Sequence, residues 1–414
     1  MHRRTALFAA LPWPWWVHAA EPGGPAALAD GALRIATAWQ RPGTGATEGR
    51  HCVAVLQVHW AEGRVQVLAE HGLPSRAHGL LARSDGGCVV VANRPGRWLM
   101  RLDAQGNVAR HLRLDDEQPP RTLNGHAEAG ADGAWLYTTE TDPATGAGWL
   151  SVRDPQTLAR VAQFESHGID PHQLLPGPDA ADATLMVANG GIARDALGRK
   201  LPAPMAPSLV QLDARTGALR GRWTLPDPQL SLRHMAWNTA WNTAWNGVSK
   251  APSTADADSP PLRLGLALQA EHAALQARAT APVLAVWQAA PAAPLQGEER
   301  VGAARLTLQG AGAAARLLGG GYAGDIAPAP GGGFVLSAQK QGRALWWHPA
   351  RPEDLTPVAQ VTEPCGLLPL PEGGGVALSA GRGLARWHLD EAPRMLPWPA
   401  LLAPDNHWVA LARA

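Results

Sequence analysis

The stretch HGLLARSDGGCVVVANRPGRWLMRLD, residues 78–103, contains the repeating unit that decides the fold. It opens with His78 and a short apolar strand, passes through an Asp-Gly-Gly turn, and continues with a hydrophobic strand over Cys88–Asn93. A further strand over Trp98–Asp103 ends in another Asp-containing turn. Short strands bounded by Gly and Asp turns are typical of β-sandwiches and β-propellers.

The same unit recurs along the chain, and recurrence of one unit of short strands favours a propeller over a sandwich. The later units differ mainly in the length of their loops. Five further units open, in chain order, at His126, His172, His234, near Tyr322–Asp325 and at Cys365.

A last strand, over Asn406–Ala412, carries His407 at the opening position and has no successor. The strands expected over Leu33–Trp39 and Cys52–Val58 precede the first full unit. Pairing the last strand with these two would complete a seventh blade and remove exposed strand edges. The sequence therefore predicts an all-β, seven-bladed β-propeller, closed by N- and C-terminal strands in one composite blade.

The N-terminal segment predicts export. Residues 1–20, MHRRTALFAALPWPWWVHAA, combine Arg3 and Arg4 with an apolar stretch that is too short to span a bilayer. This pattern is typical of a signal peptide and favours the twin-arginine (Tat) route over the Sec route. We therefore expect a periplasmic protein whose single propeller domain spans residues 21–414, with no membrane span in the mature chain.

One segment breaks the repeat. An exact tandem repeat of Ala-Trp-Asn-Thr begins at Ala236, and a polar stretch follows it. We interpret residues 236–261 as a loop insertion.

The composition excludes several functions. A net charge of +1 gives no electrostatic basis for binding nucleic acid. Three cysteines cannot all pair with one another, so the chain is not a disulfide scaffold. The absence of Cys-x-x-Cys-His excludes covalent haem, and the absence of a Gly-x-Gly-x-x-Gly turn gives no basis for a nucleotide.

The opening position of each unit predicts a metal site. The first strand of each propeller blade lines the central channel, so equivalent positions converge on one axis. Imidazole and thiolate are the usual ligands of zinc, copper and iron. Glu140 or Asp405 could orient the histidines, His167 could add another ligand, and the fifth unit offers a residue near Asp325. The candidate metal ligands are His78, His126, His172, His234, Cys365 and His407.

Other interpretations remain open. The histidines could instead hold the blades in register through hydrogen bonds to backbone. Arg76, Arg233 and Lys340 lie close to the same phase of the repeat and could bind an organic anion, such as a metal-chelating carboxylate. We expect a binding protein that holds a metal ion or metal chelate. The alternatives are a metal-dependent hydrolase or oxidoreductase, whose catalytic residues the sequence does not assign, and a protein-interaction scaffold.

Several motifs resemble those of a known family. They are Arg76–Gly79, Gly125-His126, Tyr137–Glu140, Ser166–Leu174, Val187–Ile192, Pro207–Val210, Leu230–His234 and Asp405–His407. Together they resemble a bacterial family of exported propellers that is known only as a domain of unknown function, DUF1513. The chain departs from the family pattern at Ala127, where a glycine is expected, and at Gln339-Lys340.

The resemblance implies a fold similar to that of WD-type propellers and of the quinoprotein amine dehydrogenase beta chain. Members of the family are often encoded beside imelysin-like proteins and di-haem oxidoreductases. The resemblance therefore implies periplasmic handling of a metal, with iron as the expected one, and these proteins as partners.

Overall fold

The computed structural model describes residues 32–41, 50–130, 133–177, 183–238, 261–289, 304–370, 375–399 and 403–412. Residues 1–20, the expected signal peptide, lie outside these ranges, as do residues 239–260 of the expected insertion. Strand β16 (Leu230–Trp237) includes the first two residues of that segment, and Trp237 is buried in the core. Within the described ranges, no helix is long and apolar enough to cross a membrane.

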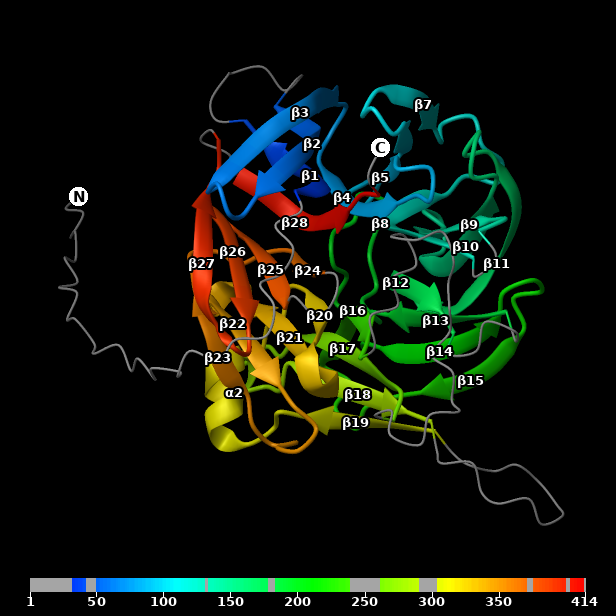
Figure 1. Ribbon diagram of the computed structural model, residues 1–414. Helices are drawn as coiled ribbons and strands as arrows, with labels where there is room; N and C mark the ends of the chain where they lie inside the picture. The colour runs from blue at the N-terminus through cyan, green and yellow to red at the C-terminus, as the bar shows by residue number, and fades with distance from the viewer. Residues whose placement is uncertain are drawn as a thin grey trace, which may run out of the picture.

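Seven four-stranded antiparallel sheets are arranged around a central axis (Figure 1). This confirms the predicted seven-bladed propeller. Each of six sheets is formed by four strands that follow one another in sequence, and the strand named first in each is innermost. These six sheets are β4 (Ala77–Ala82), β5 (Cys88–Ala92), β6 (Trp98–Leu102) and β7 (Val108–Arg113); β8 (Thr122–Ala129), β9 (Leu136–Thr141), β10 (Ala147–Arg153) and β11 (Arg160–Ile169); β12 (Pro171–Pro176), β13 (Thr184–Asn189), β14 (Ser208–Asp213) and β15 (Leu219–Trp223); β16, β17 (Arg263–Ala270), β18 (Leu284–Gln288) and β19 (Arg305–Gln309); β20 (Ile326–Ala329), β21 (Gly333–Ala338), β22 (Arg343–Trp347) and β23 (Thr356–Gln360); and β24 (Leu367–Pro369), β25 (Val376–Ala380), β26 (Gly383–His388) and β27 (Glu391–Pro397).

The seventh sheet is the predicted composite blade. Its order is β28-β1-β2-β3, where β28 is Ala403–Ala410 and β1 is Leu33–Gln40. Ile35 of β1 faces Ala410 of β28 in antiparallel register, so strands from opposite ends of the described chain lie side by side (Figure 1). The outer strands are β2 (His51–His59) and β3 (Arg64–Leu73), and β3 was not predicted.

Helices are short and lie between strands. Helix α1 spans Leu275–Ala279. Helix α2 (Ala313–Gly319) and two 3₁₀ turns, Pro330–Gly332 and Gln339–Gln341, were not predicted.

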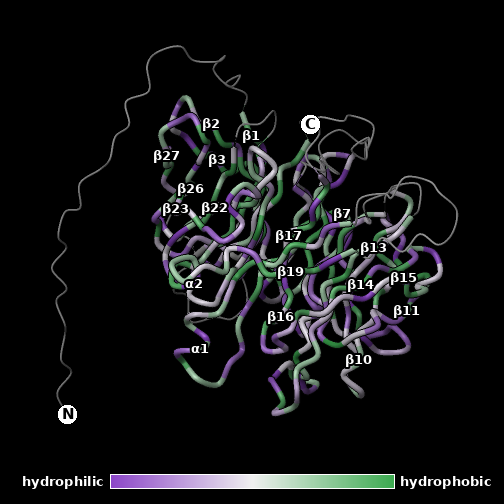
Figure 2. The backbone as a smooth tube through the Cα atoms, turned by 90° about the horizontal axis from the view of Figure 1, so that it is seen from below, coloured by the Kyte–Doolittle hydropathy of each residue, from purple (hydrophilic) through white to green (hydrophobic). Residues whose placement is uncertain are grey.

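Burial falls from the axis outward. All eight residues of the inner strand β16 are buried, whereas the outer strand β7 is mostly exposed. Hydrophobic residues follow the middle strands, such as β17, and hydrophilic residues gather in the loops (Figure 2). One apolar cluster spans three blades, with Val53, Val89 and Leu136 as members, so the blades stabilise one another by burying shared apolar surface.

A buried ion pair stabilises the blade formed by β8–β11. The Arg153 side chain is fully buried and donates to Glu140 Oε1 at 2.8 Å and to Glu117 Oε1 at 2.7 Å. Burial by itself lowers the pKa of Arg153, but Glu140 and Glu117 offset this effect and leave that pKa raised. Thr138 and Ser151 also donate to Glu140, each at 2.7 Å. The expectation that Glu140 orients a channel histidine is therefore wrong.

We predict that Arg153→Met lowers the free energy of unfolding by about 3–5 kcal/mol, because it removes the cation that contacts the buried Glu140 carboxylate at 2.8 Å and leaves only Arg160 at 4.0 Å. Urea denaturation at neutral pH measures this change. Arg113→Met is the matched control, because the Arg113 side chain is 73% exposed and its loss is expected to cost less than about 0.5 kcal/mol. A loss below about 1 kcal/mol in the Arg153 variant would contradict this account.

Candidate metal centre

Five inner strands carry a β-bulge at the opening histidine. In β4, for example, the register with β5 shifts between Ala77 and Leu80, and His78 lies in that interval. A bulge adds an unpaired residue, bends the strand and changes the direction of a side chain. The same shift occurs around His126, His172, His234 and His407, in β8, β12, β16 and β28.

These bulges bring the five imidazole rings together. The centroids of neighbouring rings lie 4.5–5.9 Å apart; the shortest distances are from His234 to His172 and to His407, and the longest is from His78 to His234. Nε2 of His234 lies 2.9 Å from Nε2 of His172 and 3.3 Å from Nε2 of His126. In one group of four, His78, His126, His172 and His234, the potential ligand atoms all lie within 4.8 Å of one another.

Glycines allow the rings to approach one another. Gly125 precedes His126 and has a φ of +105°, which an L side chain rarely adopts. A Cβ on Gly125 would lie 2.5 Å from Cδ2 of His78, and one on Gly79 would lie 2.4 Å from the Gly125 carbonyl oxygen. The Gly-His and His-Gly pairs of the sequence are therefore needed for the close packing of this cluster.

The group of four is held in the neutral state. Burial lowers the pKa of His78, His126, His172 and His234 well below 6.5, and the neighbouring histidines and Arg94 lower it further. A neutral imidazole retains a lone pair on one nitrogen, which is the form that binds metals. Both ring nitrogens of His78 are buried and have no hydrogen-bond partner among the residues that the structure describes.

His407 has a carboxylate behind it. Its Nδ1 lies 3.5 Å from Oδ2 of Asp325, whose carboxylate also accepts from the backbone N–H groups of Leu367 and Ile326, at 2.8 and 2.9 Å. Nε2 of His407 is buried and has no partner within the described part of the chain. Asp325 is thus the contribution of the fifth unit to this centre. The side chain of Asp405, the other carboxylate expected to orient a histidine, lies outside the described residues.

An arginine contacts the cluster at His172. Arg94 donates through Nη1 to Asp170 and through Nη2 to Nδ1 of His172. Because a guanidinium has no acceptor, Nδ1 of His172 must accept, and the proton of the neutral ring is then on Nε2. His172 therefore donates from Nε2 to His234.

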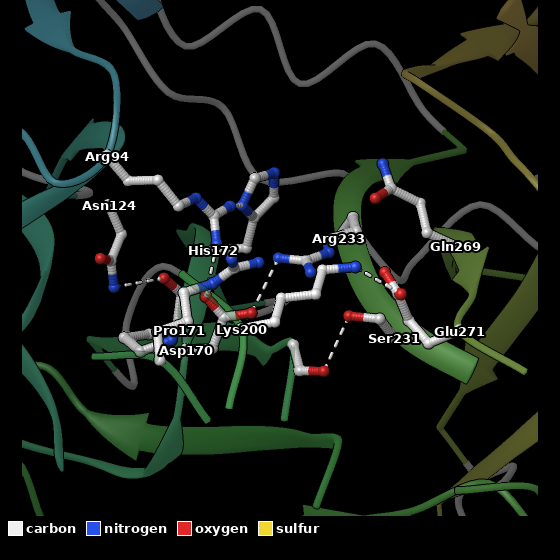
Figure 3. Close-up of polar contacts among 12 residues, drawn as sticks. Arg94, Asn124, Asp170, Pro171, His172, Lys200, Ser231, Arg233, Gln269 and Glu271 are labelled. Carbon is white, nitrogen blue, oxygen red and sulfur yellow. Dashed lines mark hydrogen bonds and ion pairs between the residues drawn. The ribbon is translucent and has the colours of Figure 1, made fainter. Parts of the chain in front are cut away.

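Asp170 neutralises only part of this positive charge. Arg233 donates to its Oδ2 at 3.0 Å, and Arg194 donates to its Oδ1 at 3.2 Å (Figure 3 shows Arg94 and Arg233 converging on it). Burial raises the pKa of Asp170, but Arg94, Arg233 and Arg194 outweigh burial and leave that pKa lowered. Burial also lowers the pKa of Arg94 to about 10.

The other candidate residues lie outside the histidine cluster. Cys365 is two residues before β24, which pairs with β25 without a bulge, and its Sγ donates to the Glu363 carbonyl oxygen at 3.2 Å. Nε2 of His167 contacts the Gly217 carbonyl oxygen at 3.0 Å. Neither residue belongs to the group of four.

Of the three cations predicted for an anion site, Lys340 lies against Tyr322, with its Nζ 4.0 Å from the centroid of the ring. Burial raises the pKa of Tyr322, and the charges of Arg233 and Arg76 partly oppose this rise. The sequence analysis did not identify Arg94 and Arg194, because both lie in loops between the second and third strands of their blades. The only sequence signal for this charge cluster is Asp170, two residues before His172.

Comparison with solved structures supports the fold. A Bacteroides fragilis protein provisionally assigned as a 6-phosphogluconolactonase is 11% identical with a TM-score of 0.55, and the match covers 94% of this chain and all of that one. A similarly assigned Bacteroides uniformis protein is 11% identical with a TM-score of 0.52, and the match covers 90% and 99% of the two chains. The Dos1 propeller is 11% identical with a TM-score of 0.50, over 91% and 84%. At this identity the likeness extends to the fold alone.

No curated protein sequence matches the chain. Residues 71–411, which include all five clustered histidines and all seven inner strands, match the family described as a protein of unknown function, DUF1513. The chain therefore belongs to the DUF1513 family.

Proposed function

We propose that this protein binds a first-row transition metal ion in the bacterial periplasm, at the centre of its propeller. The observation that carries the proposal is the convergence of neutral, buried imidazoles, among which His78 has no hydrogen-bond partner for either ring nitrogen within the described residues. Buried polar atoms are almost always hydrogen-bonded, so an imidazole whose two nitrogens are buried without a protein partner supports the presence of a bound ligand here. The twin-arginine pattern at Arg3 and Arg4 supports export.

The spacing of the nitrogens suits one ion. A tetrahedral zinc ion with Zn–N bonds of about 2.0–2.1 Å keeps its ligand nitrogens about 3.3 Å apart. The Nε2 atoms of His234 and His126 are 3.3 Å apart. His78, which packs against His126 with a centroid distance of 4.8 Å, is the third ligand of the proposed site.

His172 and His407 are the two candidates for the fourth ligand, and their hydrogen-bond partners distinguish them. Arg94 donates to Nδ1 of His172, so the proton on Nε2 of that ring would have to leave before a metal could bind there. Asp325, in contrast, faces Nδ1 of His407 and leaves its Nε2 free for a metal. Metal-bound histidines usually donate their other N–H to a carboxylate or carbonyl oxygen. His407 is therefore the proposed fourth ligand.

Imidazole ligands accept zinc, copper and iron. We predict that the full chain, isolated from the periplasm and analysed by mass spectrometry for these metals, contains close to one metal ion per chain. The double variant His126→Asn, His234→Asn is expected to lose the metal, while the matched control His111→Asn, at an exposed position in β7, keeps it. Wild-type protein that stays metal-free after reconstitution with each metal would contradict the proposal and favour a structural role for the ring.

The fourth ligand has its own test. We predict that His407→Asn and Asp325→Asn each weaken metal affinity by about 10- to 100-fold, the usual effect of losing a ligand or the carboxylate behind it. His172→Asn is expected to change the affinity less than threefold. Competition with a chromophoric chelator measures these affinities. A larger effect for His172→Asn than for His407→Asn would reverse this assignment.

We also predict that the metal-free protein becomes less stable as the pH falls below about 6.5. The unfolded chain binds protons on its histidines near pH 6.5, whereas the pKa values of the buried group of four lie well below this. The unfolded state then binds more protons than the native state. The free energy of unfolding should fall by up to about 1.4 kcal/mol per pH unit for each such histidine.

Urea denaturation at pH 7.5, 6.5 and 5.5 measures this slope. His234→Asn should reduce the slope by up to about 1.4 kcal/mol per pH unit, the contribution of one histidine, whereas His111→Asn should retain the wild-type slope. Equal stability of the wild type at pH 7.5 and 5.5 would contradict the neutral, buried cluster.

A further inference from the structure

The histidine cluster offers an ion ligands that carry no negative charge. All members of the group of four are buried imidazoles, and no carboxylate or thiol of the described residues belongs to that group. Asp325 lies 3.5 Å from Nδ1 of His407, the ring nitrogen that would face away from an ion bound at Nε2. An ion bound by these imidazoles would therefore keep its full formal charge in a buried site.

Two arginines beside the rings add positive charge. Arg94 donates through Nη2 to Nδ1 of His172. Arg233 directly precedes His234 in β16, and only 2% of its surface is exposed. Burial lowers the pKa of these two histidines most, and the charges of both arginines lower it further. The arginines therefore also oppose a positive ion at the same rings.

The neighbouring carboxylates do not cancel this charge. Arg94, Arg194 and Arg233 all contact one carboxylate, that of Asp170. Even when Asp325 is counted as well, three guanidinium groups stand beside two carboxylates, so these groups carry a net charge of +1. A cation at the cluster is thus surrounded by neutral ligands and a net positive field.

The charge of the ion decides how unfavourable these surroundings are. The free energy of moving an ion out of water rises with the square of its charge, so a divalent ion costs about four times as much as a monovalent ion of the same size. Repulsion by a fixed positive charge is proportional to the charge of the ion, and is about twice as large for the divalent ion. A buried site with neutral ligands therefore favours a monovalent cation.

Of zinc, copper and iron, the three metals that imidazole ligands accept, copper alone has a common monovalent state. We propose that the ion held by the histidine cluster is Cu(I), in preference to divalent ions such as Zn(II). This inference rests on the proposed function, since it names the ion bound at the same site. The 3.3 Å separation between Nε2 of His234 and Nε2 of His126 suits either metal, so the selection comes from charge.

Anaerobic competition titrations of the full chain at pH 7.5 test this proposal, with bathocuproine disulfonate competing for Cu(I) and 4-(2-pyridylazo)resorcinol competing for Zn(II). We expect one Cu(I) per chain, bound at least 100-fold more tightly than Zn(II). Arg233→Gln should strengthen the binding of both ions, because it removes a positive charge beside His234. The factor for Zn(II) should be about the square of the factor for Cu(I), for example about tenfold against threefold.

Arg113→Gln is the matched control. It removes an exposed charge on the outer strand β7 and should change neither affinity. Circular dichroism verifies that each variant is folded. If Arg233→Gln is unfolded, Arg94→Gln removes the other neighbouring charge, and the ratio of the Zn(II) and Cu(I) affinities is again the quantity that should shift toward Zn(II).

The outcomes separate this inference from the proposed function. Zn(II) binding tighter than Cu(I), or equal factors for the two ions in the folded arginine variant, would overturn the assignment of Cu(I) and leave the metal site standing. Absence of binding of both ions in the wild type would overturn the metal site and the assignment together.

Discussion

The β-bulge at the start of five inner strands is the constraint on which the centre of this molecule depends. A regular strand directs successive side chains to the two faces of its sheet, toward the neighbouring blades. The bulges at His78, His126, His172, His234 and His407 turn one side chain per blade toward its counterparts instead. The two blades without this irregularity, β20–β23 and β24–β27, contribute no histidine, and one of them supplies Asp325 in its place.

The chemistry of the centre follows from burying imidazoles beside arginines. The rings stay neutral because burial and the positive charge of Arg94 both make their protonation unfavourable. The negative charge of Asp170 offsets part of the repulsion among the three guanidinium groups that contact it. The structure thus places a set of neutral imidazoles next to a cluster of charged groups with net positive charge.

The sequence predicted more of the fold than of the candidate site. The repeat gave the blade count and the composite closure, because strand patterning and turn residues are local signals. It missed the outermost strand of each blade, such as β3, whose exposed residues do not alternate clearly. The phase of the repeat selected the five histidines that converge, but it also selected Cys365, since a bulge cannot be distinguished from a regular strand start by spacing alone. The repeat also pointed to a residue near Asp325 in the fifth unit. Arg94 and Arg194, in contrast, depend on contacts between blades, which no local pattern encodes.

The pairing of β28 with β1 has a consequence for how the molecule matures. These strands are separated in the chain by the other six blades, so the ring closes through the longest-range contact of the fold, a kind of contact that slows folding. Because β28 also carries His407, the pairing of β28 with β1 both closes the ring and adds the fifth imidazole to the cluster. The cluster therefore has its full number of histidines only in a chain whose ring has closed. An ion that needs His407 as a ligand would bind only after that closure.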